Sequence, residues 1–195
     1  MKRLAIVLLL CFISLPLLAQ EETLIGGEME SGGFGGPVVK FGSINGESGI
    51  FVGGRGGWII NHTFILGGGG YGLTNDVKAK VLGPYGQRYL NFGYGGVELE
   101  YIAQSDKLIH LSVMTLIGGG GVGWKDESIR SGMNGDTDAF FVIEPAAQMN
   151  LNITKYFRLS AGVSYRYVSG VNSPVATNAD LSGPAGVLTF RFGKF

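Results

Sequence analysis

The sequence predicts an all-β protein, an eight-stranded antiparallel up-and-down barrel that spans a membrane. Three observations lead to this fold class. The chain is rich in glycine, with 35 Gly in 195 residues, and poor in charge, with 15% Asp, Glu, Lys and Arg. Apolar and polar residues alternate with a period of two in many segments, which is the side-chain repeat of a β-strand. Short and long connections also alternate along the chain, which is typical of membrane barrels.

The N-terminus has the layout of a secretory signal peptide. Met1-Lys2-Arg3 is positively charged, the next residues to Leu18 are almost all apolar, and Ala19 is a small residue at a plausible cleavage point. The run is short for a spanning helix, which needs roughly 20 apolar residues. Cys11, the single cysteine, lies in this segment, so we expect no disulfide after cleavage. The predicted organisation is a signal peptide at 1–19, a short segment at 20–30 and a barrel at 31–195.

Eight segments read as strands, because each is rich in Val, Ile, Phe and Tyr and is bounded by turn-forming residues. The segment 108–124 could also be considered as a transmembrane helix, but it is short and contains His110 and four consecutive glycines, which favour a strand. The predicted strands are 31–42, 49–60, 63–74, 87–103, 108–124, 138–153, 157–169 and 183–195.

The connections predict which strand ends lie together. Those at 61–62, 104–107 and 154–156 are short, and those at 43–48, 75–86, 125–137 and 170–182 are longer and polar. An even strand count with short turns at one end and longer loops at the other predicts periplasmic turns and external loops. The connection at 43–48 is the weakest example of a long loop, because Asn45-Gly46 is a signal for a tight hairpin.

The polar face of the strands predicts what fills the barrel. The interior of an eight-stranded barrel is just wide enough for side chains to fill it, and buried charges need partners. We therefore expect a structural polar network, with a polar pathway for a small solute as the alternative. The residues predicted to face the lumen are Lys40, Arg55, Glu98, Glu100, His110, Glu144, Arg158, Arg166 and Arg191.

Aromatic residues lie near both predicted ends of the strands, where membrane barrels have aromatic girdles. Beside the short turns these residues are Trp58, Phe64, Tyr101, Tyr156 and Phe157. Toward the longer loops they are Tyr71, Tyr89, Trp124, Phe140 and Tyr167.

Two glycine-rich stretches, 67–72 and 118–123, satisfy the spacing G-x-G-x-x-G. A dinucleotide site needs a helix directly after this motif, and neither stretch is followed by a helical pattern. Glycine within strands instead supplies the curvature that a narrow barrel needs. We predict no cofactor and no metal. The 15 basic and 15 acidic residues balance, so we also expect no nucleic-acid partner.

The chain ends Phe190-Arg191-Phe192-Gly193-Lys194-Phe195. A last strand that closes on phenylalanine resembles the assembly signal of outer-membrane barrels, here Phe190, Phe192 and Phe195, although Phe195 is out of register with the other two. With the glycine-rich strands and Gln20 after Ala19, the chain resembles the family of small eight-stranded outer-membrane proteins, in the form found in Bacteroidota. The resemblance implies export, insertion by the barrel assembly machinery and surroundings of outer-membrane lipid in a Gram-negative-type bacterium.

These observations predict a non-enzymatic outer-membrane protein with a structural role, or one that meets a protein or surface partner through its external loops. A narrow channel or a carrier for a small or apolar solute is the alternative. A lipid-modifying enzyme is less favoured, because its Ser–His–carboxylate set of Ser112, His110 and Glu98 or Glu100 would lie in a crowded lumen. A soluble secreted β-protein that binds a ligand is the remaining possibility.

Overall fold

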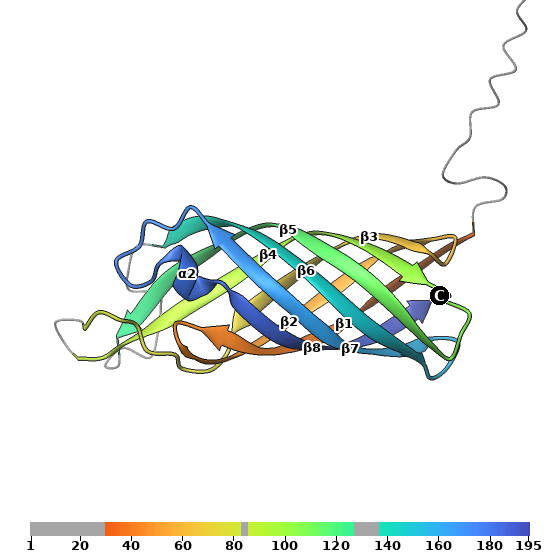
Figure 1. Ribbon diagram of the computed structural model, residues 1–195, viewed down its shortest axis with the longest axis horizontal. Coiled ribbons are helices and arrows are strands. Elements are labelled where there is room, and N and C mark those ends of the chain that lie inside the picture. The colour runs from red at the N-terminus through yellow and green to blue at the C-terminus, as the bar shows by residue number, and fades with distance from the viewer. Residues whose placement is uncertain (1–29, 83–85, 127–136) are drawn as a thin grey trace, which may run out of the picture.

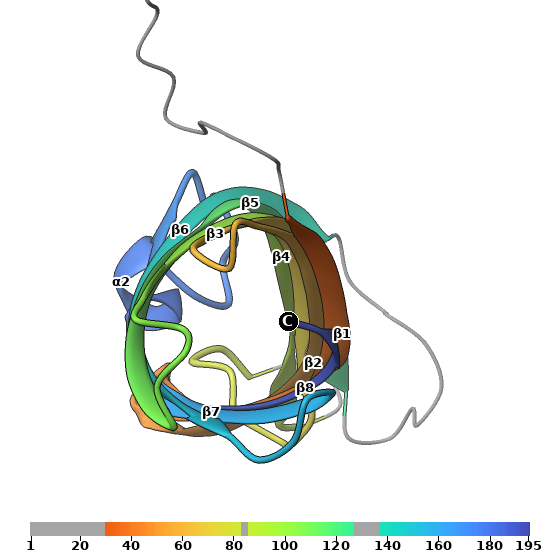
Figure 2. The same cartoon turned by 90° about the vertical axis from the view of Figure 1, so that its right-hand side faces the viewer.

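The computed structural model describes residues 30–82, 86–126 and 137–195, and within them a closed barrel of eight strands. Each strand pairs antiparallel with the next one in the chain, and β1 pairs with β8 to close the ring (Figures 1 and 2). The fold-class prediction is confirmed. The strands are β1 (Ser31–Ile44), β2 (Glu47–Ile60), β3 (Phe64–Leu73), β4 (Arg88–Ala103), β5 (Ile109–Asp126), β6 (Asp138–Asn152), β7 (Phe157–Ser169) and β8 (Gly183–Lys194).

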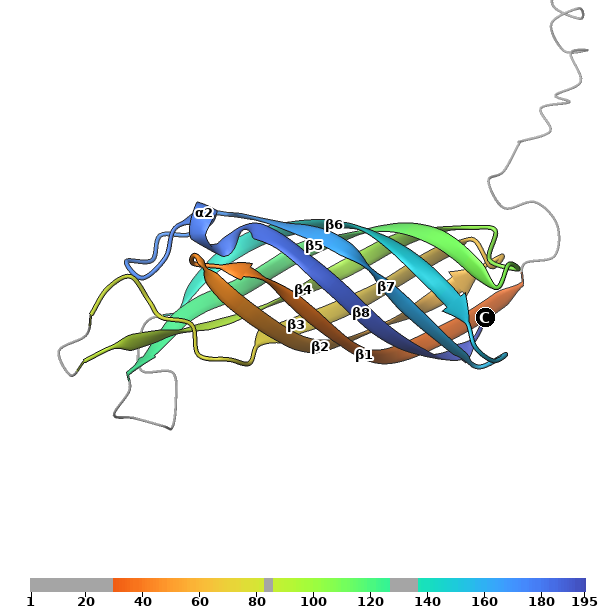
Figure 3. The same ribbon diagram turned by 60° about the horizontal axis from the view of Figure 1, so that its bottom comes forward.

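The barrel is elongated and its strands are strongly tilted, so its two ends are well separated (Figures 1 and 3). One end holds the C-terminus and the short turns, and we call it the terminal end. The other end holds the longer connections and the one-turn helix α2 (Asn178–Leu181), and we call it the loop end. No helix in the described part of the chain is long and apolar enough to cross a membrane.

The strand register separates an apolar outer face from an inner face. In β4, Val97 is 54% exposed whereas its neighbour Glu98 is fully buried. Val97 pairs with Ile117 of β5, which is also exposed, so the apolar outer face continues from strand to strand. A soluble protein rarely exposes a continuous apolar surface of this kind, because large apolar side chains gain about 1.5–3 kcal/mol each from leaving water.

The first connection differs from the prediction. Residues 43–48 were predicted as one of the longer loops, but β1 and β2 extend through them and pair as far as Ile44 and Glu47. The turn is Asn45-Gly46, with φ values of 53° and 78°. Two successive residues with positive φ are the requirement of the type I′ hairpin turn, which Asn-Gly meets at little cost. The local turn signal therefore prevailed over the pattern of alternating connections.

Both glycine-rich stretches lie within strands, 67–72 in β3 and 118–123 in β5, and neither precedes a helix. A Cβ atom on Gly67 would lie 2.2 Å from the carbonyl oxygen of Gly56, and one on Gly118 would lie 2.1 Å from that of Gly95. Neighbouring backbones thus approach too closely for any side chain at these two positions. Glycine here permits the tight coiling of the strands.

The loop end of the barrel is filled with apolar side chains, which the sequence did not predict. Val77, Val175 and Leu181 come from the loops and are fully buried against lumen residues such as Phe51 and Phe92. The helix α2 also went unpredicted. It is one turn long and begins with a capping box in which Thr177 and Asp180 satisfy each other's backbone N–H groups.

The aromatic residues predicted for the two girdles divide between the outer and inner faces of the barrel. Trp58, Tyr101, Tyr156 and Tyr167 are exposed on the barrel surface, as residues of an interface girdle would be. For Tyr71 and Phe140 the prediction of an outward-facing side chain is wrong, because they are only 4% and 6% exposed and belong to the apolar cluster inside the barrel. Their positions along the strands were right, but the face was not, since successive side chains of a strand point to opposite sides.

Candidate functional site

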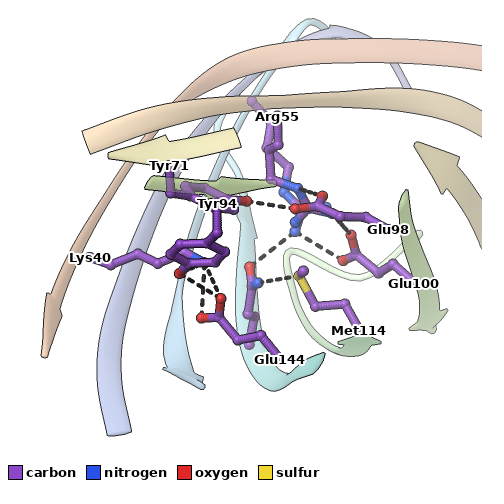
Figure 4. Close-up of polar contacts among 10 residues, drawn as sticks. Lys40, Arg55, Tyr71, Tyr94, Glu98, Glu100, Met114 and Glu144 are labelled. Carbon is purple, nitrogen blue, oxygen red and sulfur yellow. Dashed lines mark hydrogen bonds and ion pairs between the residues drawn. The ribbon is translucent and has the colours of Figure 1, made fainter. Parts of the chain in front are cut away.

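The polar residues inside the barrel are the first candidate site. All nine side chains predicted to face the lumen are buried, and they lie on seven different strands. The structure brings six of them into two linked clusters at the middle of the barrel, while Arg166, Arg158 and His110 lie apart from these clusters. Figure 4 shows the two clusters with their hydrogen bonds and ion pairs.

The first cluster is built around two carboxylates of β4. Arg55 Nε lies 2.6 Å from Glu98 Oε2, and Arg55 Nη2 donates to Glu100 Oε2 at 2.9 Å. Arg191 reaches the same Glu100 from the far side and donates through Nη2 and Nη1 at 2.9 and 3.2 Å. Two-pronged contacts between a guanidinium and a carboxylate are among the strongest side-chain hydrogen bonds. Glu100 therefore links β4 to β2 and β8 across the lumen.

The second cluster is built around Glu144 of β6. Lys40 Nζ lies 2.9 Å from both of its carboxylate oxygens, Tyr94 donates to Oε2 at 2.7 Å, and Ser164 donates to Oε1 at 2.6 Å. Lys40 also lies 3.5 Å from the centre of the Tyr71 ring. This carboxylate is fully hydrogen-bonded, which is the condition for keeping a charge inside a protein.

Tyr71 joins the two clusters. Its hydroxyl donates to Glu98 Oε1 at 2.6 Å (Figure 4), while the ammonium group of Lys40 packs against the face of its ring. Tyr71 and Tyr94 are members of the network that were not predicted from the sequence. Tyr94 could have been found, because it lies an even number of residues from Glu98 and Glu100 and so shares their face. Gln148 was missed as well, and it accepts a hydrogen bond from Arg191 at 3.1 Å.

Arg166 lies nearer the loop end, among the apolar residues. Its Nε donates to the carbonyl oxygen of Leu181 at 2.7 Å, and Nη2 donates to that of Ser43 at 3.1 Å. The guanidinium stacks over the rings of Phe51 and Phe92, at 4.5 and 5.1 Å from their centres. Backbone carbonyls and aromatic faces thus take the place of a carboxylate and hold α2 against the barrel.

His110 is buried near the terminal end but does not form the contacts of a catalytic set. Its Nδ1 is hydrogen-bonded to the carbonyl oxygen of Lys107 at 3.1 Å, and its Nε2 has no hydrogen-bond partner among the described residues. Ser112 instead accepts a hydrogen bond from Asn150 at 3.0 Å. No hydrogen bond joins His110 to Ser112 in the described part of the chain, so the interior lacks the Ser–His contact that activates a nucleophile.

The middle of the lumen leaves almost no free space. The cavity between Lys40, Arg55, Tyr71 and Glu144 has a volume of about 10 Å³, which is room for about one water molecule. Beyond it, the apolar cluster fills the loop end. Within the described residues no group of three or more His, Cys, Asp or Glu side chains could hold a metal ion. The middle of the barrel is thus a packed polar core, and its loop end is a packed apolar one.

The phenylalanines predicted as an assembly signal lie on both faces of the barrel. Phe192 faces outward, is 52% exposed and stacks on Phe157 with ring centres 4.8 Å apart. Phe190 pairs with Leu159 of β7 in the same register. Phe195 lies past the end of β8 and stacks on the buried Phe34 at 6.2 Å. The expected break in register is present, and the last residue turns into the mouth of the barrel.

Comparison with known proteins shows similarity at the level of fold. No protein-family model matches the chain, and no curated protein matches it. Among solved structures, the Neisserial surface protein A is 13% identical, with a TM-score of 0.59 and coverage of 87% of this chain and 100% of that one. Ail of Yersinia pestis, solved with the heparin analogue sucrose octasulfate, is 12% identical, with a TM-score of 0.53 and coverage of 86% and 99%.

The N-terminal β-barrel domain of OprF of Pseudomonas aeruginosa is similar to the same extent. It is 10% identical, with a TM-score of 0.53 and coverage of 84% of this chain and 96% of that domain. At these identities the similarity shows the fold alone. The chain therefore has the architecture of the small eight-stranded outer-membrane barrels. A special relation to the Bacteroidota form remains a prediction.

Proposed function

We propose that this protein is an integral, non-enzymatic outer-membrane barrel with a closed lumen, which acts structurally or through contacts of its external loops. The observation that supports this proposal is the combination of an apolar outer surface with a filled interior whose middle is polar. Charged side chains inside and apolar side chains outside reverse the usual arrangement of a soluble globular protein, and they are stable where hydrocarbon surrounds the barrel.

The outer surface supports a lipid environment in its shape as well as its chemistry. An apolar groove of about 500 Å³ runs along the outside of β3, β4 and β5, where Leu66, Leu99 and Val113 are exposed. Lipid acyl chains can fill such a groove, whereas water would leave these side chains without apolar contacts. In a closed barrel every strand is paired on both sides, so the backbone N–H and C=O groups are hydrogen-bonded. This is the condition for crossing a membrane with strands.

The orientation and the route to the membrane are part of the proposal. We infer that residues 1–19 are a cleaved signal peptide and that 20–30 lie on the periplasmic side, next to the terminal end of the barrel. Residues 1–29 lie outside the described part of the structure. Phe190, Phe192 and Phe195 would serve recognition by the assembly machinery. The loop end would then face outward, where its longer connections can meet a protein or surface partner.

The experiment that tests this proposal is membrane fractionation combined with gel migration before and after boiling. We expect the protein in the outer-membrane fraction, with a shift in mobility on boiling, because a closed barrel stays folded in detergent until it is heated. A wholly soluble protein whose mobility does not change would show that the proposal is wrong. It would favour the soluble ligand-binding alternative instead.

A further inference from the structure

A basic pocket opens at the terminal end of the barrel, away from the polar clusters of the interior. Its volume is about 670 Å³, and it lies between the turns at 104–107 and 153–156 and the C-terminal residues. Arg158, Lys155 and Lys194 line it, and Asp106 is the one acidic side chain among the lining residues. These three cationic side chains outnumber the two negative groups, the side chain of Asp106 and the terminal carboxylate of Phe195, so positive charge is in excess.

Arg158 is the buried cation of this pocket, whereas Lys155 and Lys194 are exposed. It is 9% exposed, and its Nε is buried without a hydrogen-bond partner among the described residues. The other buried arginines are engaged: Arg55 and Arg191 contact carboxylates, and Arg166 contacts backbone carbonyls. Arg158 forms no ion pair within the described residues, and its cross-strand neighbour is another cation, Arg191.

The surroundings of Arg158 hold its guanidinium in place without neutralising it. The group lies 4.2 Å from the centre of the Phe195 ring, which covers one of its faces. Glu100, a carboxylate in the same half of the lumen, is already bound by two arginines. Burial of a cation without an anionic partner is costly, and it is relieved when an anion binds. The N–H groups at the edge of the guanidinium are therefore available to donate hydrogen bonds to a bound anion.

We propose that this pocket binds a phosphate group, with Arg158 as its central ligand and Lys155 and Lys194 as flanking cations. A guanidinium presents paired N–H donors that match the oxygens of phosphate, and lysine adds charge without a strict geometry. Three cationic side chains attract a dianion more strongly than a single carboxylate. Tyr156 and Phe195 form apolar walls, so the phosphate can belong to a larger ester. Its source is either a soluble phosphate ester or a phospholipid headgroup.

The test uses the folded full-length barrel in a non-ionic, phosphate-free detergent. Inorganic phosphate is titrated at constant ionic strength, with acetate as a planar monoanion for comparison. We expect phosphate to bind more tightly than acetate, and Arg158→Gln to weaken phosphate binding by roughly tenfold or more, because hydrogen bonds to charged groups are lost. Lys125→Gln is the matched control, since it removes one positive charge at the loop end, where Lys125 pairs with Asp76.

Several outcomes would overturn the proposal. They are no binding of phosphate, equal affinity for acetate, or unchanged phosphate affinity in an Arg158→Gln barrel that still shifts on boiling. If Arg158→Gln does not fold, Lys155→Gln decides, because Lys155 is exposed in a turn and its loss should weaken binding several-fold without affecting the barrel. Unchanged affinity in that variant overturns the proposal as well.

A second titration identifies the source of the phosphate. The same protein is titrated with glycerol 3-phosphate and with a short-chain phosphatidylglycerol below its micelle concentration. Markedly tighter binding of the lipid supports a phospholipid headgroup, and equal binding supports a soluble phosphate ester. Both measurements are made on the isolated barrel, so their outcome does not depend on the proposed location or on the role of the external loops.

Discussion

Glu100 holds two guanidinium groups, and its contacts illustrate how this barrel keeps charges away from water. Each buried ion loses several kcal/mol of hydration, and only close, hydrogen-bonded pairing recovers it. Glu100 recovers it with three donor atoms from Arg55 and Arg191. Such a group is worth less to the stability of the fold than its contacts suggest, but its removal is costly, because the two arginines stay behind.

At the residue scale we therefore predict that Glu100→Gln destabilises the barrel by roughly 3–5 kcal/mol, because the substitution keeps the size of the side chain and leaves two buried cations without their shared anion. Urea unfolding of the protein in lipid vesicles measures the change. Glu47→Gln is the control, since Glu47 is exposed at the β1–β2 hairpin and should have little effect. Equal stability of the two variants would contradict the prediction.

At the scale of elements, the polar network connects the strands to one another. It draws Lys40 from β1, Arg55 from β2, Tyr71 from β3 and carboxylates from β4 and β6 into contact across the lumen. Gln148 adds a contact with Met114 of β5, and Ser164 and Arg191 bring in β7 and β8. All eight strands thus contribute to one set of contacts, which fixes their arrangement in addition to the backbone ladder.

The glycines of β2 provide a prediction that separates the two faces of one strand. A Cβ on the inward-facing Gly53 would lie 1.9 Å from the carbonyl oxygen of Gly70 and 2.8 Å from the ring of Tyr71. On the outward-facing Gly54 the nearest atom, the carbonyl oxygen of Gly36, is 3.6 Å away. We expect Gly53→Ala to destabilise the barrel by about 1–3 kcal/mol, because the backbone or the tyrosine must move.

Gly54→Ala is the matched control for this change, and it should alter the free energy of unfolding by less than about 0.5 kcal/mol. Both variants are measured by the same urea unfolding in vesicles. A loss of stability that is equal in the two variants would mean that general glycine flexibility, and not the close approach on the inner face, explains the composition of β2.

The loop that contains α2 provides a prediction about pH. Burial alone would raise the pKa of Asp180, but hydrogen bonds from Lys80 and Thr177 and the charge of Lys80 lower the pKa overall. The ionised carboxylate therefore stabilises the folded conformation of residues 177–182 above the ordinary pKa of about 4. This stabilisation is lost as the pH falls through the lowered pKa of Asp180. We expect faster amide hydrogen exchange in 177–182 at pH 3 than at pH 5, after correction for the intrinsic rates.

The variant Lys80→Met tests the cause of this effect. Without the ammonium group, the pKa of Asp180 should move back toward the ordinary value, and the pH dependence of loop protection should weaken. A pH dependence that is identical in the variant and the original protein would show that the Lys80–Asp180 ion pair does not stabilise the closed loop.

At the scale of the whole molecule, two kinds of side chain close the lumen. Polar clusters fill the middle, and apolar side chains from the strands and loops fill the loop end. We predict no steady conductance when the purified protein is reconstituted in planar bilayers, because the central cavity admits about one water molecule. A reproducible open level at modest voltage would instead favour the channel alternative.

The sequence by itself determined the strands and most of their faces. Period-two alternation is a local property, so the inward positions of Lys40, Glu98 and Arg191 could be predicted without knowledge of any partner. The same is true of the Asn45-Gly46 turn, whose φ values depend on two residues alone. The prediction of a longer loop at 43–48 is wrong because the local turn signal prevails over the regular alternation of connections.

The tertiary structure alone decided which groups meet. Closure of the barrel brings Arg191 of β8 to Glu100 of β4 and leaves Arg158, on the neighbouring strand, without an anionic partner among the described residues. It also directs Tyr71 and Phe140 inward and buries Val175 and Leu181 at the loop end of the barrel. Contacts across a lumen depend on the strand tilt and register of the closed ring, and these are properties that no single strand encodes.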